Sequence, residues 1–448
     1  MKRISMLTCL IIALIWAGLP LAILAGTLAS QTFIQTDKLL ASDKVGYADF
    51  GSVVVLSNDG KFMAVGAHRH PVAGRNGQGK VYLFRRNDDS TWSEVQRLVA
   101  SDGAANDKFG HAIAMAAAPD YTLIIGAPDD DTGFDRNLGA AYVFAYNGSS
   151  WSQQRKLPVV DARKFSYDTR GKTVAISADG GTAFVGAPGV DGAGGSTPGA
   201  VYVFSRSGSR WTQTQKIEGP IGGAAGIGRG MALSDDGKTL LVGGVYSPSG
   251  PIIGHGIVYA YKKSSGVWGE VASLIPSGGV QFDEFGTAIA TNHNATTVLV
   301  GSPNNGSGRV HIFYASSDVW TEVVTLIPRP PASFYGDFGT AVALTPDGHE
   351  AAIGAWLNGS GAVHRLVGAG TAWEIIQTLT TPDDRQEHLG FAVAMTNDGQ
   401  LIAGGARSAH SNRGTYDVVG AVYLFEPETI EPEPEEPAIS VYLPLVIK

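Results

Sequence analysis

Residues 109–128, FGHAIAMAAAPDYTLIIGAP, contain the pattern on which the fold prediction depends. Phe-Gly precedes a short run of small and apolar residues, turn residues follow, and a second apolar run ends in Gly-Ala-Pro. Two such runs separated by turn residues are typical of a β-hairpin. The pattern occurs seven times, and the glycines that begin the copies are on average 56.5 residues apart. Four further copies start at Phe50, Phe285, Phe338 and Leu389, and two weaker ones start at Gly171 and Gly228.

Each copy continues with two more predicted strands. The third strand is a run such as GKVYLF (79–84) or GAVYVF (199–204), rich in β-branched and aromatic residues. The fourth strand begins at a tryptophan that is followed six residues later by Leu or Ile. Six of the eight tryptophans occupy this position: Trp92, Trp151, Trp211, Trp268, Trp320 and Trp373. The seventh copy lacks this strand, because an acidic segment starts at Glu426.

The missing strand is predicted at the other end of the chain. Phe33 precedes Gly51 by 18 residues, just as Trp92 precedes Gly110. Residues 33–39 are therefore expected to complete the last copy. Seven four-stranded sheets packed around an axis bury faces that one sheet alone would leave exposed. The sequence predicts an all-β fold over residues 31–425: a seven-bladed β-propeller of four-stranded antiparallel blades, whose last blade is closed by the N-terminal strand.

These motifs resemble the FG-GAP repeat family, whose best-known members are the propellers of integrin α subunits. Gly126-Ala127-Pro128 and Gly186-Ala187-Pro188 carry the complete Gly-Ala-Pro, and Gly301-Ser302-Pro303 is a variant. The resemblance covers about residues 33–425, and the dipeptides diagnostic of WD40 or kelch propellers are missing from the sequence. It implies extracellular adhesion or protein recognition and, in some members, bound calcium. It does not identify a ligand.

The N-terminal segment predicts an extracellular location. Residues 1–30 combine Lys2 and Arg3 with a long apolar run, which is typical of a secretory signal peptide. The run is also long enough to act as an uncleaved membrane anchor. In either case the propeller is expected to be secreted or to lie on the cell surface. The single cysteine, Cys9, lies in this segment, so a mature chain would contain no disulfide.

The C-terminal end contains two distinct segments. Residues 426–437 form an acidic, proline-rich linker with six glutamates, which like charges and proline keep extended. Residues 438–448, AISVYLPLVIK, are apolar and too short to cross a bilayer as a helix. They resemble VYLPLV-type tails of some secreted bacterial proteins, which suggests a bacterial source and attachment to the cell envelope. The alternative is a last strand that docks on the propeller.

Charge and motif content argue against several classes of function. The net charge of −8 disfavours a nucleic-acid binder, which needs cations to meet phosphates. The mature chain offers no cysteine nucleophile and no G-x-S-x-G motif, and no second histidine follows His349-Glu350 at zinc-protease spacing. No segment matches the calcium loop D-x-[DN]-x-[DN]-G, so we expect Asp59, Asp179 and their equivalents to form turns. We predict no catalytic residue, no metal and no cofactor.

The long loops are the expected binding surface. In an antiparallel four-stranded blade, the loops after the second and fourth strands share one face, and here those loops are the long ones. Long loops on a rigid scaffold usually carry binding residues. We predict a basic sector from blades seven and one beside an acidic sector from blade two, with a plain solvated surface as the alternative. The candidate ligand-binding residues are His68, His70, Arg75, Asp129, Asp130, Asp131, Asp135, Arg407, His410 and Arg413.

Three hypotheses about function follow. The first is a monomeric, non-enzymatic adhesion propeller that recognises an extracellular protein or glycan through its long-loop face. The second is an extracellular hydrolase or lyase that degrades a polymer with loop carboxylates. Two acids within about 10 Å, with His or Arg beside them in a pocket at the mouth of the axis, would favour it. The third is a structural component of the cell envelope.

Overall fold

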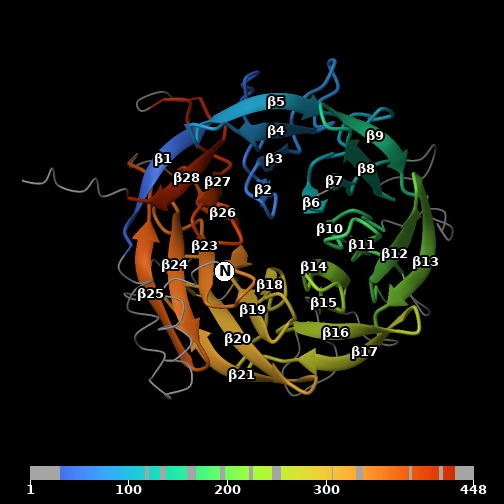
Figure 1. Ribbon diagram of the computed structural model, residues 1–448, viewed down its shortest axis with the longest axis vertical. Coiled ribbons are helices and arrows are strands. Elements are labelled where there is room, and N and C mark those ends of the chain that lie inside the picture. The colour runs from blue at the N-terminus through green and yellow to red at the C-terminus, as the bar shows by residue number, and fades with distance from the viewer. Residues whose placement is uncertain are drawn as a thin grey trace, which may run out of the picture.

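The computed structural model describes residues 31–116, 121–131, 138–158, 168–191, 197–220, 226–244, 254–304, 306–328, 336–382, 386–412 and 417–428. Within these ranges the chain forms 28 strands and no helix, and the strands make seven four-stranded antiparallel sheets. Figure 1 shows the sheets arranged as blades around a central axis. The predicted all-β seven-bladed propeller is confirmed. Since the described part has no helix, it also has none that could span a membrane.

The first four blades run in chain order from the innermost to the outermost strand. Blade one consists of β2 (Val53–Leu56), β3 (Phe62–Ala67), β4 (Lys80–Arg86) and β5 (Trp92–Leu98). Blade two consists of β6 (Ala112–Ala116), β7 (Thr122–Ala127), β8 (Ala140–Tyr146) and β9 (Trp151–Lys156). Blade three consists of β10 (Thr173–Ile176), β11 (Thr182–Ala187), β12 (Ala200–Ser207) and β13 (Arg210–Glu218). Blade four consists of β14 (Ile227–Leu233), β15 (Thr239–Gly244), β16 (Ile257–Ser264) and β17 (Val267–Leu274).

Blades five and six repeat this order, and blade seven joins the two ends of the propeller. Blade five consists of β18 (Ile289–Thr291), β19 (Thr297–Ser302), β20 (Arg309–Ser316) and β21 (Val319–Leu326). Blade six consists of β22 (Val342–Leu344), β23 (Glu350–Ala355), β24 (Ala362–Ala369) and β25 (Ala372–Leu379). Blade seven consists of β26 (Leu389–Met395), β27 (Ile402–Ala406), β28 (Ala421–Pro427) and β1 (Phe33–Leu39).

The ring is closed by hydrogen bonds between β1 and β28, as the spacing of Phe33 predicts. The pairing runs from Phe33 opposite Pro427 to Leu39 opposite Val422. Strand β28 therefore extends two residues beyond the predicted boundary at 425, because Glu426 and Pro427 still pair with β1 and Glu426 forms an ion pair with Arg86 at 2.5 Å. The rest of the acidic linker, the apolar tail and the N-terminal segment lie outside the described residues.

The two glycines of the repeat motif allow adjacent blades to approach each other closely. In all seven blades, the glycine of Gly-Ala-Pro lies directly against the carbonyl oxygen of the Phe-Gly glycine in the next blade. Gly66 and Gly110 form one such pair, and a Cβ added at Gly66 would overlap the Gly110 oxygen. Both halves of the motif are thus explained by one backbone contact, repeated around the axis.

The tryptophan at the start of each outer strand packs between blades. Trp151 of blade two, for example, lies in one core cluster with Phe62 and Leu83 of blade one. Gln96 of blade one also bonds the backbone of Trp151 twice, through its Oε1 at 2.8 Å and its Nε2 at 2.7 Å. Phe33 takes the tryptophan position in blade seven, where its amide donates to Gln377 Oε1 at 2.9 Å and its carbonyl accepts from Gln377 Nε2 at 2.7 Å. The closing strand therefore contacts the preceding blade through the same hydrogen bonds as an outer strand that follows the rest of its blade in the chain.

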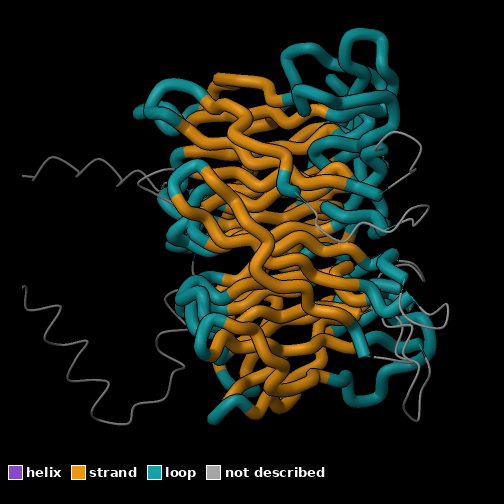
Figure 2. The backbone as a smooth tube through the Cα atoms, turned by 90° about the vertical axis from the view of Figure 1, so that its right-hand side faces the viewer, coloured by secondary structure: helices purple, strands orange, loops and turns teal. Residues whose placement is uncertain are grey.

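The propeller has two unlike faces (Figure 2). On one face, short turns connect the first strand to the second and the third to the fourth. Asp59 and its equivalents close these turns by accepting bonds from a Ser or Thr two residues earlier, which confirms that they are turn formers. The other face, which we call the long-loop face, carries the loops after the second and fourth strands. The Phe-Gly motif lies on this face, where the chain enters the innermost strand of each blade.

Candidate functional site

The Phe-Gly motif forms the centre of a tight turn on the long-loop face, which we call the FG turn. Its glycine has φ between 82° and 95° in every blade, a conformation that a type II turn requires at its third residue. In six blades the amide of the fourth residue bonds the carbonyl of the first, for example Ser52 to Asp49 at 3.1 Å. The first residue has φ between 50° and 60° in all seven blades, which is rare outside glycine.

The side chains that flank the FG glycine gather around the axis. Side chains from all seven blades line an open central channel, and the fourth residues of several FG turns lie at its end. We call this end the axial mouth. The fourth residues of the seven turns are Ser52, His111, Lys172, Arg229, Thr287, Thr340 and Phe391, and the first residues are Asp49, Lys108, Thr169, Gly226, Glu284, Asp337 and His388. The same backbone turn therefore presents seven different pairs of side chains.

The side of the mouth formed by blades two to four is basic. A cavity of about 380 Å³ there is lined by Lys108, Lys172 and Arg229, together with His111 and Asp129. Lys108 pairs with Asp129 at 2.5 Å. The pKa of Lys172 is lowered, first by burial and then by the charges of Arg229 and Lys108, against the opposing effect of Asp129. Burial and the charge of Lys172 lower the pKa of His111 to about 2, so this imidazole is neutral at physiological pH.

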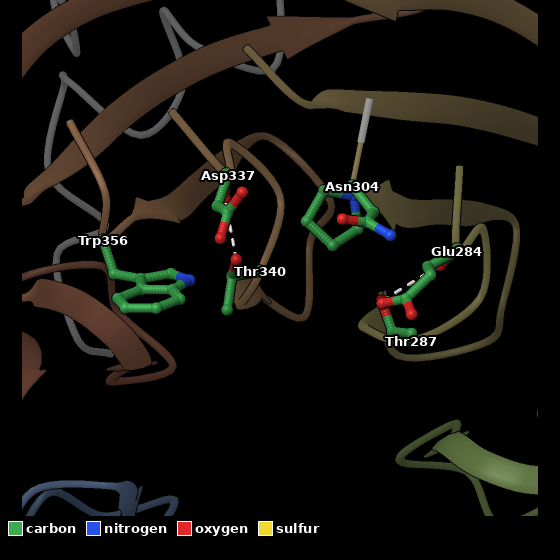
Figure 3. A pocket seen from close by; sticks show the side chains of 7 residues that line it. Glu284, Thr287, Asn304, Asp337, Thr340 and Trp356 are labelled. Carbon is green, nitrogen blue, oxygen red and sulfur yellow. Dashed lines mark hydrogen bonds between the residues drawn. The ribbon is translucent and has the colours of Figure 1, made fainter. Parts of the chain in front are cut away.

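The side formed by blades five and six is acidic. A pocket of about 230 Å³ is lined by Glu284, Asp337, Asn304 and Trp356 (Figure 3). Thr287 and Thr340 also line it, and their hydroxyls donate to the backbone carbonyls of Glu284 and Asp337 at 3.1 and 2.8 Å, which fixes both turns. Burial raises the pKa of Asp337 to about 6, a hydrogen bond from Trp356 opposes this, and the charge of Glu284 adds to it.

An aromatic cluster connects the acidic pocket to blade seven. The ring of Trp356 lies 4.8 Å from that of His388 and 5.5 Å from that of Phe391, measured between centroids. The guanidinium of Arg407 lies 4.8 Å from the Trp356 ring centre and 4.0 Å from that of Phe391. The mouth thus contains a cationic region, an anionic region and an aromatic region, each supplied by different blades.

Three of the predicted binding residues lie beside the mouth. His68 is buried with its Nδ1 3.0 Å from Ser52 Oγ and its Nε2 3.3 Å from Asp49, and burial lowers its pKa to about 3. Arg407 stacks on the aromatic cluster, and Asp129 lines the basic cavity.

Other predicted residues brace the loops instead. His70 is buried against backbone oxygens of Pro71 and Asp43, at 2.6 and 3.3 Å. Asp130 is buried and accepts from Tyr142 at 2.7 Å and from Lys156 at 2.8 Å. Arg75 donates to the carbonyl of Gly103 at 2.9 Å, and the His410 ring bonds the carbonyl of Asp417 at 3.1 Å.

The predicted charge sectors are largely neutralised within the loops. Asp129 and Asp130 pair with Lys108 and Lys156, and Arg69 pairs with Asp49 at 3.1 Å. Asp131 is exposed at the edge of the described residues, whereas Asp135 and Arg413 lie outside them. The basic region of the mouth is formed by blades two to four, because the three cations that line its cavity, Lys108, Lys172 and Arg229, belong to the FG turns of these blades.

Sequence reasoning missed the residues that define the mouth. The predicted binding residues include none of Lys172, Arg229, Glu284, Asp337 and Trp356, because single charges beside a glycine have no motif of their own. Glu284 enters the sequence analysis only as one of the loop carboxylates of the hydrolase hypothesis. A signal was present: aligning the seven copies on the FG glycine puts the first four of these five residues one residue after it or two before it. Within the described residues, no group of three or more His, Cys, Asp or Glu side chains is arranged to hold a metal ion.

The comparisons with known proteins agree with the repeat assignment. The FG-GAP repeat family matches four segments of the chain, residues 33–84, 92–144, 151–204 and 268–313. The first match begins at β1 and thus includes the strand that closes the ring. No curated protein is significantly similar to this sequence.

Proposed function

We propose that this FG-GAP propeller is a secreted or cell-surface, non-enzymatic binding protein that takes an extracellular glycan or protein at its axial mouth. One observation carries the proposal: seven backbone turns of like conformation, six of them closed by the same hydrogen bond, present seven different pairs of flanking residues around one opening. Packing requires the glycines of these turns, but it does not require Lys172, Glu284 or Trp356 beside them. Side chains that the scaffold does not need are the ones that are available for recognition.

The acidic pocket favours a glycan within this proposal. Trp356 lines it beside the carboxylates of Glu284 and Asp337 and the amide of Asn304 (Figure 3). An indole offers a flat apolar surface with a polar edge, and carboxylates and amides accept hydrogen bonds from hydroxyl groups. A sugar ring presents matching groups, since it has an apolar face of C–H bonds and a rim of hydroxyls.

An array that carries both glycans and extracellular proteins tests the proposal. The full secreted chain is expected to bind, and Trp356→Ala is expected to lose at least tenfold in apparent affinity. Lys238→Ala is the matched control, because Lys238 is exposed on the short-turn face, where it pairs with Asp236 at 3.4 Å. Equal loss in both variants, or undiminished binding by Trp356→Ala and Lys172→Met alike, would contradict binding at the mouth.

A polymer-degrading hydrolase is the second candidate, and the paired acids Glu284 and Asp337 favour it. An acid with a pKa near 6 beside a second carboxylate can act as a general acid. The described lining of this pocket, however, includes neither His nor Arg. Mass spectrometry of a bound oligosaccharide after prolonged incubation separates the two functions. We expect an unchanged mass, whereas shorter products that disappear with Asp337→Asn would establish the hydrolase.

A further inference from the structure

We propose that the basic cavity between blades two, three and four binds a tetrahedral dianion: free sulfate, free phosphate or a phosphate monoester carried on a sugar. The inference deepens the proposed function and rests on it, because it assigns a ligand class to one region of the axial mouth. The proposal rests on three observations: the cavity itself, the cations that line it, and the glycines that leave its volume unfilled.

The cations come from three successive blades. Lys108 is the first residue of the FG turn in blade two, and Lys172 and Arg229 are the fourth residues in blades three and four. Because each reaches the cavity from a separate turn, an ion at the centre would be contacted from three sides. Two lysine ammonium groups and a guanidinium offer the donors that sulfate and phosphate oxygens accept.

The charge balance of the lining favours a dianion over a monoanion. The lining residues include three cations and one carboxylate, Asp129, while His111 is neutral. Lys108 already pairs with Asp129, and within the described part of the chain Lys172 has no carboxylate at ion-pair distance. The lining therefore carries a net charge of +2, which a dianion would neutralise. Like charges held together in a partly buried site repel each other, and a bound anion would remove this repulsion.

Small residues keep the cavity open. Gly226 occupies in blade four the turn position that Lys108 occupies in blade two, and Gly189 follows Pro188 in blade three. Among the described residues, a Cβ added at Gly226 would meet only the Pro188 oxygen, at 3.7 Å. Thr169 and Thr197 complete the lining. The Thr197 hydroxyl can donate to an oxyanion or to the sugar that carries it, whereas the Thr169 hydroxyl donates to the Asp168 carbonyl at 2.8 Å.

Lys172 does not contribute to the stability of the fold. Burial and neighbouring cations lower the pKa of Lys172, so its ammonium is disfavoured in the folded state. A lysine whose pKa is lowered by folding reduces stability at neutral pH, because its ammonium is more favourable in the unfolded chain. Replacing Lys172 with an uncharged side chain of similar length should therefore leave the propeller at least as stable. A cation that the fold tolerates but does not need is consistent with a role in binding.

Isothermal titration calorimetry with sodium sulfate tests the site on the full chain, at constant ionic strength set with sodium chloride. We expect one saturable site in the wild type and at least tenfold weaker binding in Lys172→Met. Lys172→Arg should stay within about threefold of the wild type. Lys238→Met, an exposed lysine on the short-turn face, should bind like the wild type. A thermal unfolding curve for Lys172→Met that matches or exceeds that of the wild type shows that the variant is folded.

Two further titrations identify the source of the anion. If galactose 6-phosphate, whose ester is close to a dianion at neutral pH, binds at least tenfold more tightly than sulfate and galactose does not bind, the group is carried on a sugar. Equal affinities for sulfate and the ester assign the site to the free ion. The proposal would be overturned if Lys172→Met bound sulfate as tightly as the wild type. It would also be overturned if injecting sulfate into the wild type released or absorbed no more heat than injecting chloride. The array result with Trp356→Ala would still stand in that case, so the two failures are distinguishable.

Discussion

The two faces of this propeller are built from the same seven repeats, yet polar side chains have different roles in their turns. On the short-turn face, five blades use one solution: a Ser or Thr hydroxyl bonds an aspartate two residues later, which also caps a backbone amide. The aspartates are Asp59, Asp179, Asp236, Asp347 and Asp398. The side chain itself builds the turn there, so its identity is restricted.

On the long-loop face, the backbone builds the turn instead. The FG glycine supplies the positive φ, and the flanking residues contribute mainly their amide and carbonyl groups. Their side chains are consequently free to differ, and they range from Lys172 to Asp337. The comparison indicates where binding residues can lie in such a repeat. They can occupy positions beside a turn that is formed by main-chain conformation and hydrogen bonds alone.

Gly66→Val is expected to have the largest effect on stability, because it tests the scaffold that both faces share. The new side chain would overlap the Gly110 carbonyl of the next blade, and a backbone atom cannot move aside as a side chain can. We expect a loss of more than about 3 kcal/mol in the free energy of unfolding, measured by urea denaturation. Gly269→Ala is the control, since open space surrounds Gly269, and it should change stability by less than about 0.5 kcal/mol.

Asp398→Ala tests the short-turn face and should have an intermediate effect. Asp398 accepts from Thr396 Oγ1 at 2.6 Å and from the amide of Gln400 at 3.0 Å. Its removal should cost about 1–2 kcal/mol in unfolding free energy and leave sulfate and glycan binding unchanged. Asp88→Ala, at an exposed position, is the control. A large loss of binding in Asp398→Ala with normal stability would mean that the short-turn face also contributes to recognition.

Asp337→Asn tests the mouth through its pH dependence and should have a smaller effect. Burial raises the pKa of Asp337 to about 6, so folding favours its protonated form. Wild-type stability contributed by this group is present at low pH and is lost as pH rises from about 4 through 6. The variant should therefore gain stability relative to the wild type between pH 4.5 and pH 7.5 in parallel urea titrations.

Asp179 on the other face provides the opposite case. The hydrogen bond from Ser177, followed by that from the amide of Gly181, lowers its pKa against the effect of burial. Its stabilisation is complete above the ordinary pKa of 3.8 and is lost on further acidification. Asp179→Asn should thus be destabilising throughout the range from pH 4.5 to 7.5, with little change across it. Parallel pH profiles for the two variants would contradict the proposed difference between the faces.

The fold was predictable because the repeat specifies it several times over. Seven copies of the repeat, four of which begin with Phe-Gly and two of which carry the complete Gly-Ala-Pro, fix the blades. The 18-residue spacing from Phe33 to Gly51 identifies the closing strand. Some strand ends were placed too early, by two residues in β4 and β28 and by three in β12. At β28, the alternation of acids and prolines suggests a linker before the pairing with β1 has ended.

The site was much less predictable, because composition does not reveal which way a loop side chain points. His70 and Asp130 look like exposed polar loop residues, yet both are buried and hold their loops in place. Lys172 and Arg229, by contrast, stand inside degenerate copies of the motif, where Arg170 and Ile227 replace the phenylalanine. Their convergence depends on the closed ring, which brings separate repeats to a common axis.

Hydrogen–deuterium exchange of the full chain, with and without the saccharide that binds best on the array, tests most directly whether recognition occurs at the axial mouth. We predict slower exchange in peptides that contain FG turns, such as residues 108–111 and 337–340, and unchanged exchange in the short turns at 234–237 and 396–399. Slower exchange confined to the short turns, with the FG turns unaffected, would contradict the account.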